Sequence, residues 1–261
     1  MTELEFVRRA LGDNAVPFRG SLFEKRVCVV LTAYNDEASI PYAVDEFLSQ
    51  FNVVDVIVVD NNSRDATARF AKDAGARVVR ERNQGYGFAC MRGLKEALYG
   101  VDADVVVLSE GDMTFRGRDI WKLLPFLDDA DLVVGSRTHM ALVDSDSQMD
   151  WFYVWGNLFV AKMLQFRFFN SKFLGKARFT DVGCTLRAIK KDALMDIIDD
   201  LSVGGHDFSP HMLKVALKKG LKVVEVPVTL RKRVGVSKGA GGNKLLGLKV
   251  GLRMLYDIIF H

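Results

Sequence analysis

The chain lacks a hydrophobic run long enough to cross a bilayer, which takes about 18 consecutive apolar residues. Met1–Leu11 mixes apolar and charged residues, so we expect a short helix there and no secretory signal. The formal net charge is only +3 over 261 residues, too small to indicate nucleic-acid binding. Because 49% of the residues are hydrophobic, we expect a folded protein with a sizeable core.

Cysteine is scarce. Cys28, Cys90 and Cys184 lie far apart in the chain and show no metal-binding spacing. The first and last lie in strand-like runs and the second in a helix-like one. We therefore expect buried free thiols and a reducing, cytoplasmic location.

Glycine is absent where two common phosphate-binding motifs would need it. A dinucleotide-binding fold has Gly-x-Gly-x-x-Gly directly after its first strand, and a P-loop has Gly-Lys-Ser/Thr there. The corresponding turn is Thr32–Ser39 (TAYNDEAS), which has no glycine. Gly85-Tyr86-Gly87 comes later and is followed by Cys90 in place of a third glycine. NAD binding and P-loop hydrolysis are both poor fits.

Apolar runs alternate with amphipathic segments in the first half of the chain. We expect strands at residues 26–34, 53–60, 76–80, 104–110 and 131–135, and helices at 38–50, 64–74, 87–99 and 118–127. This alternation predicts βαβ units, and continuous Val/Ile runs suit strands that are covered on both faces. The predicted fold class is α/β, with a mostly parallel, Rossmann-like sheet and helices on both faces.

The second half is less regular. The expected elements are helices at 151–170, 190–200, 206–219 and 243–260 and strands at 180–188 and 221–230. Pro227 indicates that its strand is at an edge of the sheet or ends there, and Asn243 is the expected cap of the last helix. Because no linker divides the chain, we predict one domain over residues 1–242 and an appended amphipathic basic helix at 243–261.

Two segments combine aromatic and basic residues. Residues 151–180 contain ten aromatic residues, five Lys or Arg and no acid, and the stretch from Val226 onward has seven basic residues and one acid, Asp257. Such helices often lie at a membrane surface or a subunit interface, although an aromatic stripe facing the core is an alternative. We expect residues 151–180 and 243–260 to face anionic lipid without spanning it. A homo-oligomer interface is the competing explanation.

Glu110-Gly111-Asp112, at the end of the expected strand 104–110, is the most informative segment. Both carboxylates can turn toward a hard cation, and Mg²⁺ or Mn²⁺ is usually held by one or two carboxylates plus substrate phosphates. An isolated acidic triplet, by contrast, is more often a solvated loop. Polar residues also follow the other expected strands, at the edge where open α/β sheets bind ligands.

The ordered set of motifs resembles the family 2 glycosyltransferases with the GT-A fold, which include dolichyl- and polyprenyl-phosphate sugar synthases. The matching segments, over roughly residues 26–240, are VVLTAYNDEASI, VVDNNSRDAT, NQGYGFACMRGL, VVVLSEGDM, DLVVGSR, FTDVGCTLRAIKKDAL and GLKVVEVPVTLRKRVGVSKG. Each motif is weak alone, and their shared order makes the resemblance specific.

The resemblance implies a role for each matching position. Asp112 and Glu110 would hold Mg²⁺ or Mn²⁺, and Arg137 would lie near the acceptor phosphate. The residues expected to act in catalysis are Asp112, Arg137 and Asp181 from the motif match, together with Asp207 as a candidate base. Those implied in nucleotide-sugar binding are Ala33, Tyr34, Asp36, Glu37, Asp60, Gly85, Gly87, Arg187, Arg231, Arg233, Ser237 and Lys238. Among these, Asp60 would bind the base, the glycines would let the backbone approach the donor, and the basic loop 231–238 would cover the diphosphate.

The chain also departs from the family pattern. Glu110 stands where Asp is usual, and its extra methylene makes Asp112 the safer metal ligand. Asn61 stands where a second Asp is frequent. After Arg137, paired arginines of some dolichyl-phosphate members are replaced by Trp155-Gly156-Asn157 and by Lys162. This last departure counts against the expected lipid-phosphate acceptor more than against the expected donor.

The resemblance implies a metal-dependent inverting transferase, peripheral on the cytoplasmic membrane face. It would move sugar from UDP- or GDP-sugar to polyprenyl phosphate or a glycolipid. An ionised lipid phosphate needs no general base, whereas a soluble hydroxyl acceptor would need a carboxylate such as Asp181 or Asp207. The alternatives are transfer to such a soluble acceptor and a non-catalytic nucleotide- or membrane-binding module. A nucleotidyltransferase is disfavoured because no glycine- and Lys/Arg-rich loop follows the first strand.

Overall fold

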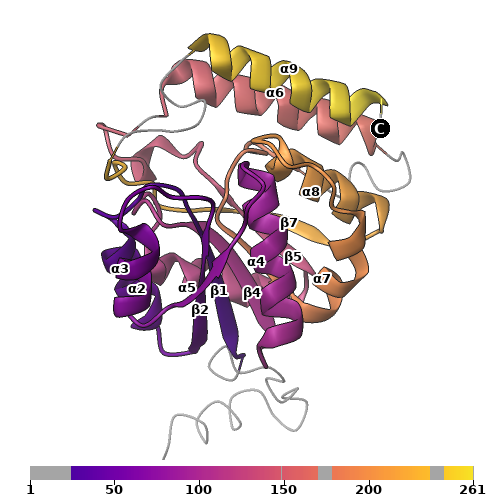
Figure 1. The fold of residues 1–261 in the computed structure, drawn as a ribbon. Coiled ribbons are helices and arrows are strands. Elements are labelled where there is room, and N and C mark those ends of the chain that lie inside the picture. The colour runs from indigo at the N-terminus through magenta and orange to yellow at the C-terminus, as the bar shows by residue number, and fades with distance from the viewer. Residues whose placement is uncertain (1–24, 148, 170–177, 236–243, 261) are drawn as a thin grey trace, which may run out of the picture.

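The computed structural model describes residues 25–147, 149–169, 178–235 and 244–260. A central sheet is flanked by helices on both faces, and a separate pair of helices lies across one end of it (Figure 1). The strands are β1 (Val27–Ala33), β2 (Val53–Asp60), β3 (Arg77–Arg80), β4 (Val105–Glu110), β5 (Leu132–Ser136), β6 (Arg187–Lys190) and β7 (Val223–Pro227). The expected α/β class is confirmed.

The seven strands are ordered β3-β2-β1-β4-β6-β5-β7. All neighbouring pairs are parallel except those of β6, which runs antiparallel to both β4 and β5. The expected strand 180–188 was placed too early, because Thr180 and Asp181 bend away to bind the Glu225 side chain and pairing starts only at Arg187. Pro227 ends the edge strand β7, as its lack of an N–H predicts.

Eight α-helices connect and cover the strands in the described part of the chain. They are α2 (Ile40–Leu48), α3 (Thr67–Asp73), α4 (Tyr86–Gly100), α5 (Ile120–Leu123), α6 (Trp151–Arg167), α7 (Lys191–Ile197), α8 (Phe208–Lys218) and α9 (Lys244–Phe260). Short 3₁₀ turns lie at Gly117–Asp119, Leu124–Asp128, Met140–Leu142 and Ile198–Asp200. The single helix expected at 118–127 is broken because Pro125 lacks the N–H that would continue α5.

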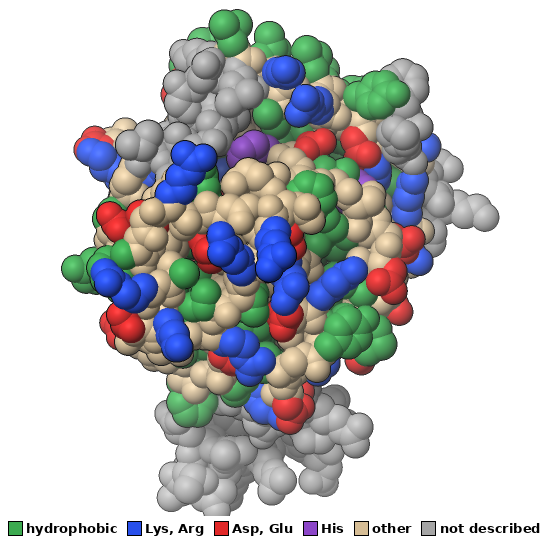
Figure 2. Space-filling model, viewed as in Figure 1, with side chains coloured by type: hydrophobic (Ala, Val, Ile, Leu, Met, Phe, Trp, Pro, Cys, Tyr) green, Lys and Arg blue, Asp and Glu red, His purple; other side chains and the backbone are tan. Residues whose placement is uncertain are grey.

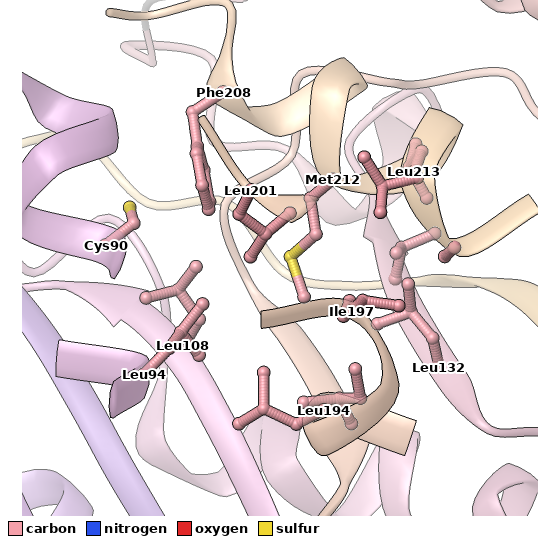
Figure 3. Close-up of a cluster of buried hydrophobic side chains, with 14 of the residues drawn as sticks. Cys90, Leu94, Leu108, Leu132, Leu194, Ile197, Leu201, Phe208, Met212 and Leu213 are labelled. Atoms are coloured by element: carbon pink, nitrogen blue, oxygen red, sulfur yellow. The ribbon is translucent and has the colours of Figure 1, made fainter. Parts of the chain in front are cut away.

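The core lies on both faces of the sheet. On one face, α4, α7 and α8 pack their apolar side chains over β4 and β5, and Figure 3 shows Leu108, Leu194 and Met212 meeting there. On the other face, α2 and the broken helix cover β1 and β4. The three cysteines are buried and unpaired, as expected from their apolar surroundings.

Helices α6 and α9 lie side by side beyond the carboxyl ends of the strands (Figure 1). Asp150 caps α6, because its Oδ1 accepts the backbone N–H groups of Phe152 (2.9 Å) and Tyr153 (3.2 Å). Gly247 lets α9 approach, since a Cβ there would lie 3.0 Å from the Tyr153 ring. The helix expected at residues 1–11 and the helix cap expected at Asn243 fall outside the described residues. The expected domain boundary at residue 242 stays a prediction.

At its C-terminal end α9 is tied to α8 by ionic contacts. Asp257 Oδ1 lies 2.5 Å from the Nζ of Lys214, and Asp257 Oδ2 lies 3.4 Å from Nδ1 of His211. Lys214 is 3% exposed, so the ion pair is buried. Although burial opposes it, these partners lower the pKa of Asp257 to about 2. The contact holds the helix pair onto the domain.

Candidate active site

A cavity of about 900 Å³ separates the sheet from helices α6 and α9. Its floor is formed by the polar ends of β1, β2 and β4, whereas its roof includes aromatic residues of α6 and aliphatic residues of α9. The roof side chains include Trp155, Phe159, Leu248, Leu252 and Met254. The chamber is therefore polar at one end and apolar at the other.

Nine of the residues predicted for the site line this cavity together. They come from the ends of β1, β4 and β5, the start of α4 and the segment after β7, and are Ala33, Tyr34, Asp36, Gly85, Glu110, Asp112, Arg137, Arg231 and Arg233. Parallel strands bring these distant segments to one edge of the sheet.

Six predicted residues do not line the cavity, namely Glu37, Asp60, Gly87, Asp181, Arg187 and Asp207. Ser237 and Lys238 lie outside the described residues. Glu37 Oε2 accepts the backbone N–H of Ala66 at 2.8 Å, and Asp60 Oδ1 accepts that of Ser63 at 3.0 Å. These two carboxylates shape the turns beneath the cavity, and their contact with a nucleotide stays a prediction.

The acid pair is held in place by a tight turn. Asp112 is 2% exposed, and its Oδ1 accepts both the backbone N–H (3.0 Å) and the hydroxyl (2.6 Å) of Thr114. Met113 has a φ of +67°, a conformation that side chains larger than Gly or Asn rarely adopt. Such strain is often stored where a functional group must be aimed. With Oδ1 fixed, Oδ2 of Asp112 is the oxygen left for a ligand.

The pair suits a hard divalent cation. Among the described residues no three His, Cys, Asp or Glu side chains converge as a complete metal cage. Oδ2 of Asp112 is buried without a hydrogen bond, however, and Glu110 lies one residue away across Gly111. Burial, together with the Asp112 charge, raises the pKa of Glu110 to about 7. A site of one or two carboxylates that leaves other positions to substrate phosphates fits Mg²⁺ or Mn²⁺.

Arg137 enters the cavity from the end of β5, and Asp181 holds it. The Asp181 carboxylate is fully buried and accepts from Arg137 Nε at 2.7 Å and Nη2 at 2.9 Å. It also accepts the backbone N–H groups of Arg137 and Gly183. Burial would raise the pKa of Asp181, but the Arg137 charge and these bonds hold it below its usual value. The geometry fits a support for Arg137 better than a general base.

Glu225 supports the same segment, and sequence reasoning missed it. Its carboxylate accepts the backbone N–H of Thr180 at 2.8 Å and that of Asp181 at 2.7 Å, and the Thr180 hydroxyl at 3.0 Å. Burial raises the pKa of Glu225 to about 7. An acid inside the otherwise apolar run of β7 was the available signal, because strands covered on both faces seldom carry one.

Arg187 and Asp207 lie away from the cavity. Arg187 is 1% exposed, and its guanidinium donates to the carbonyls of Cys184, Val182 and Ser209. It ties the loop before β6 to α8, and this buried position does not fit the role in nucleotide-sugar binding that the resemblance implied. Asp207 begins α8 and lines a separate shallow depression with Lys249 and Arg253.

The two glycines serve packing. A Cβ on Gly87 would lie 2.0 Å from the carbonyl oxygen of Val203, and one on Gly85 would lie 2.3 Å from that of Gly204. The start of α4 therefore approaches the 203–204 backbone, and Gly87 N donates to Gly204 O at 2.9 Å. We expected these glycines to admit a donor. The chain's own backbone lies close to both glycines, Gly85 also lines the cavity, and their approach to a donor stays a prediction.

Asn61 also proved structural. Its Nδ2 donates to the carbonyls of Glu81 (3.2 Å) and Asn83 (2.7 Å), while its Oδ1 accepts the N–H of Gly85 at 2.8 Å. An aspartate could not donate these bonds. This accounts physically for the amide at a position where the motif often has an acid.

The sequence model described as glycosyl transferase family 2 matches residues 28–198, which carry Asp36, Glu110, Asp112 and Arg137. The chain belongs to this family. It is a glycosyltransferase, as its motifs indicated.

Curated relatives of this family 2 glycosyltransferase match along most of their length. A UDP-N-acetylglucosamine–dolichyl-phosphate N-acetylglucosaminyltransferase of Methanococcus voltae is 28% identical, over 89% of this chain and 96% of the relative. An undecaprenyl-phosphate mannosyltransferase of Micrococcus luteus is 29% identical, over 83% and 88%. A polyprenol monophosphomannose synthase of Mycolicibacterium smegmatis is 28% identical, over 84% and 83%.

Solved structures share the fold. Glucosyl-3-phosphoglycerate synthase of Mycobacterium tuberculosis, in complex with Mn²⁺, UDP-glucose and phosphoglyceric acid, aligns with a TM-score of 0.64 at 18% identity, covering 90% of this chain and 79% of that one. Its complex with Mn²⁺, UDP and phosphoglyceric acid gives a TM-score of 0.65 at 19% identity, covering 91% and 80%. The expected GT-A fold of this family 2 glycosyltransferase is confirmed.

Proposed function

We propose that this glycosyltransferase moves a sugar from a nucleotide-diphosphate sugar to a polyprenyl-phosphate acceptor, with Mg²⁺ or Mn²⁺ held by Asp112 and Glu110. The observation that carries the proposal is the two-ended cavity. Its polar floor offers carboxylates and arginines for phosphates, and its apolar roof offers α6 and α9 for a hydrocarbon chain. Solvated sugar acceptors would need no such roof.

The donor would bind at the floor, beside Tyr34, Asp36 and the acid pair. Oδ2 of Asp112 and the Glu110 carboxylate would hold the metal, which when bound neutralises charge on the departing nucleoside diphosphate. Arg233 supplies a second positive charge at the same place. Support for a UDP-sugar and Mn²⁺ comes from the fold neighbour crystallised with both.

The acceptor phosphate would meet Arg137. This side chain lines the cavity, and although burial opposes its charge, Asp181 raises the pKa of Arg137 so that it stays a cation. A lipid phosphate is already ionised, and so attack on the sugar needs no general base. The floor accordingly does not require Asp181 or Asp207 to take a proton. Three relatives are named for transfer to dolichyl, undecaprenyl or polyprenol phosphates, which supports this acceptor class.

The outer face of the roof would rest on a lipid surface. Exposed apolar side chains that do not line the cavity include Phe166 of α6 at 78%, and Leu245 and Tyr256 of α9 at 79% and 58%. Figure 2 shows green side chains over α6 and α9, with blue Lys and Arg between them. Aromatic rings beside basic residues suit the interface of an anionic membrane. No helix in the described ranges is long and apolar enough to span one. We place the protein on the cytoplasmic face, where its free thiols would stay reduced.

A transfer assay tests the proposal. A panel of UDP- and GDP-sugars is incubated with Mn²⁺ and a short-chain polyprenyl phosphate, and the lipid product is measured. We expect one donor to give product, and Asp112→Asn to lower turnover by at least about 100-fold, because it removes the only oxygen of Asp112 left for the metal. Glu110→Gln should cost less. Transfer to soluble hydroxyl acceptors but to no lipid phosphate would contradict the acceptor, and donor hydrolysis unchanged in Asp112→Asn would contradict the metal site.

A further inference from the structure

Arg233 stands against the acid pair. Its Nη2 lies 2.8 Å from Oδ2 of Asp112 and 3.8 Å from Oε2 of Glu110. The oxygen that Arg233 meets is the one that Thr114 leaves open. The side chain is 17% exposed, so the contact is made inside the cavity.

The neighbouring arginine is bound differently. Arg231 donates from Nε to the carbonyl of Met113 at 3.0 Å, and from Nη2 to the carbonyl of Phe115 and to Glu46, both at 2.7 Å. It is therefore locked into the fold. Arg233, by contrast, has a buried Nε without a hydrogen-bond partner, and the 2.8 Å contact lacks the alignment of a hydrogen bond. Among the described residues, its guanidinium is held by the charges of the acid pair and by no hydrogen bond.

The backbone fixes where Arg233 starts. Arg231 N donates to Thr114 O at 2.8 Å, and Val234 N donates to Asp112 O at 3.1 Å. These two hydrogen bonds fix the backbone after β7 against the turn that carries the acid pair. A rotation of the Arg233 side chain can move its charge while these backbone bonds stay intact.

We propose that Arg233 is the resident counter-ion of Glu110 and Asp112, that it competes with a divalent metal for Asp112 Oδ2 in the donor-free protein, and that it turns to the donor diphosphate when donor and metal arrive together. This rests on the metal site of the proposed function. Two cations crowded on one buried oxygen repel each other, and so the metal binds weakly while Arg233 stays. A diphosphate gives the guanidinium another partner, with which it can form a bidentate pair.

The device would make metal and donor binding depend on each other. Because coupling between two ligands is reciprocal, a donor that draws Arg233 away must raise the affinity for metal, and the metal must raise the affinity for donor. The acid pair would remain neutralised in both states, which avoids a buried unpaired charge.

The test measures Mn²⁺ binding without donor or acceptor. It uses calorimetry and the loss of the electron paramagnetic resonance signal of free Mn²⁺. Arg233→Gln should bind Mn²⁺ about tenfold more tightly than wild type or better, since a unit charge beside the metal is gone. Lys232→Gln is the matched control, because it removes the same charge one residue away from a side chain that is 68% exposed and pairs with Asp146. It should bind Mn²⁺ as wild type does. Adding UDP should then tighten Mn²⁺ binding more in wild type than in Arg233→Gln.

Arg233→Ala gives a second version of the change, so that misfolding of one variant does not decide the matter. Mn²⁺ affinity in the Arg233 variants that is equal to wild type or weaker would overturn the proposal. So would an equal gain in Lys232→Gln, which would indicate bulk charge. Since sugar transfer plays no part in this measurement, failure of the transferase assay would leave its result standing.

Discussion

The Arg137 guanidinium and the Asp181 carboxylate form a two-pronged ion pair, with Nε to Oδ2 at 2.7 Å and Nη2 to Oδ1 at 2.9 Å. The pair joins the end of β5 to the loop that precedes β6, and Glu225 of β7 holds that loop from beneath. Arg137 is thus held in the cavity by contacts among three segments, which are the end of β5, the loop before β6, and β7. The fork geometry fixes its plane as well as its position.

Asp181→Asn should lower both stability and turnover. The buried Arg137 would lose its ionic partner, at a cost of about 3 kcal/mol in unfolding free energy. Turnover should fall at every pH without loss of a titrating limb, because Asp181 takes no proton in the proposed reaction. Denaturant melts and a pH–rate profile measure the two effects. Asp207→Asn, which changes the other candidate base, should leave both nearly unchanged, and a lost basic limb in either variant would indicate a general base.

Glu225 should make stability fall as pH rises. Its pKa is raised from an ordinary value of 4.5 to about 7, so the folded protein holds a proton that the unfolded chain has released. Its contribution to stability is therefore largest below about pH 4.5 and is lost as pH rises toward 7. The Glu225→Gln side chain does not titrate. As pH rises from 5 to 7, the free energy of unfolding of this variant should therefore increase by about 1–3 kcal/mol relative to that of wild type. Denaturant melts across this range measure it, and parallel stability curves would contradict it.

Gly87→Ala and Gly251→Ala should have opposite effects. A methyl at Gly87 would meet the Val203 carbonyl at 2.0 Å, which forces the backbones apart, and we expect a loss of about 2–4 kcal/mol. A methyl at Gly251, in α9, meets nothing within 4 Å and should gain up to about 1 kcal/mol from helix propensity. Thermal and denaturant unfolding compare the two. A harmless Gly87→Ala would show that α4 does not need its close approach to Gly204.

Asp257→Asn should loosen α9 from the domain. Lys214 would remain buried without its carboxylate, which typically costs about 3 kcal/mol. Asp200→Asn is the control, because Asp200 forms a 2.6 Å pair with Lys219 in which both side chains are about half exposed. Exchange of α9 amide protons should speed up in the first variant and stay unchanged in the second. Equal effects would show that Asp257 contributes no more than a surface ion pair.

Phe166→Glu should weaken binding to anionic vesicles. Phe166 is 78% exposed on α6, and a carboxylate there would have to enter the lipid interface. Tyr99→Glu is matched in exposure, at 70%, but lies at the end of α4 remote from α6 and α9 (Figure 1). Co-sedimentation with vesicles at low salt should fall several-fold for the first variant only. Absence of wild-type sedimentation, or a shift from dimer to monomer in Phe166→Glu, would favour a contact between two copies.

Much of the fold followed from local pattern. The runs of β1, β2 and β4 are continuous and β-branched, and such runs are recognisable without knowledge of their neighbours. The polar ends of these strands then indicated the site, because parallel strands bring their ends to one edge. This reasoning pointed to Asp112 and Arg137, which line the cavity and whose functional roles stay predictions.

The missing parts depend on contacts between distant segments. An arginine in a motif gives no sign of burial, so Arg187 was expected in the pocket although three backbone carbonyls surround it. Gly87 was expected to face a donor because nothing local shows the approach of Val203. Helices α6 and α9 were expected to form an outer surface. Their inner faces line the cavity because the two helices, about 90 residues apart in the chain, pack side by side, and the sequence pattern does not show that contact.

Strand β6 has a consequence for how the two halves of the site come into register. It is four residues long, and within residues 25–260 as far as they are described it is the one strand that joins the β3-β2-β1-β4 portion of the sheet to β5 and β7. The acid pair follows β4 and Arg137 follows β5, so β6 sets the distance between these two parts of the cavity floor. Because β4 and β5 each pair with β6 and not with each other, they are joined in folding only when β6, which comes later in the chain, inserts between them. Pairing of β6 with both neighbours is therefore the folding step that brings the acid pair and Arg137 into one site.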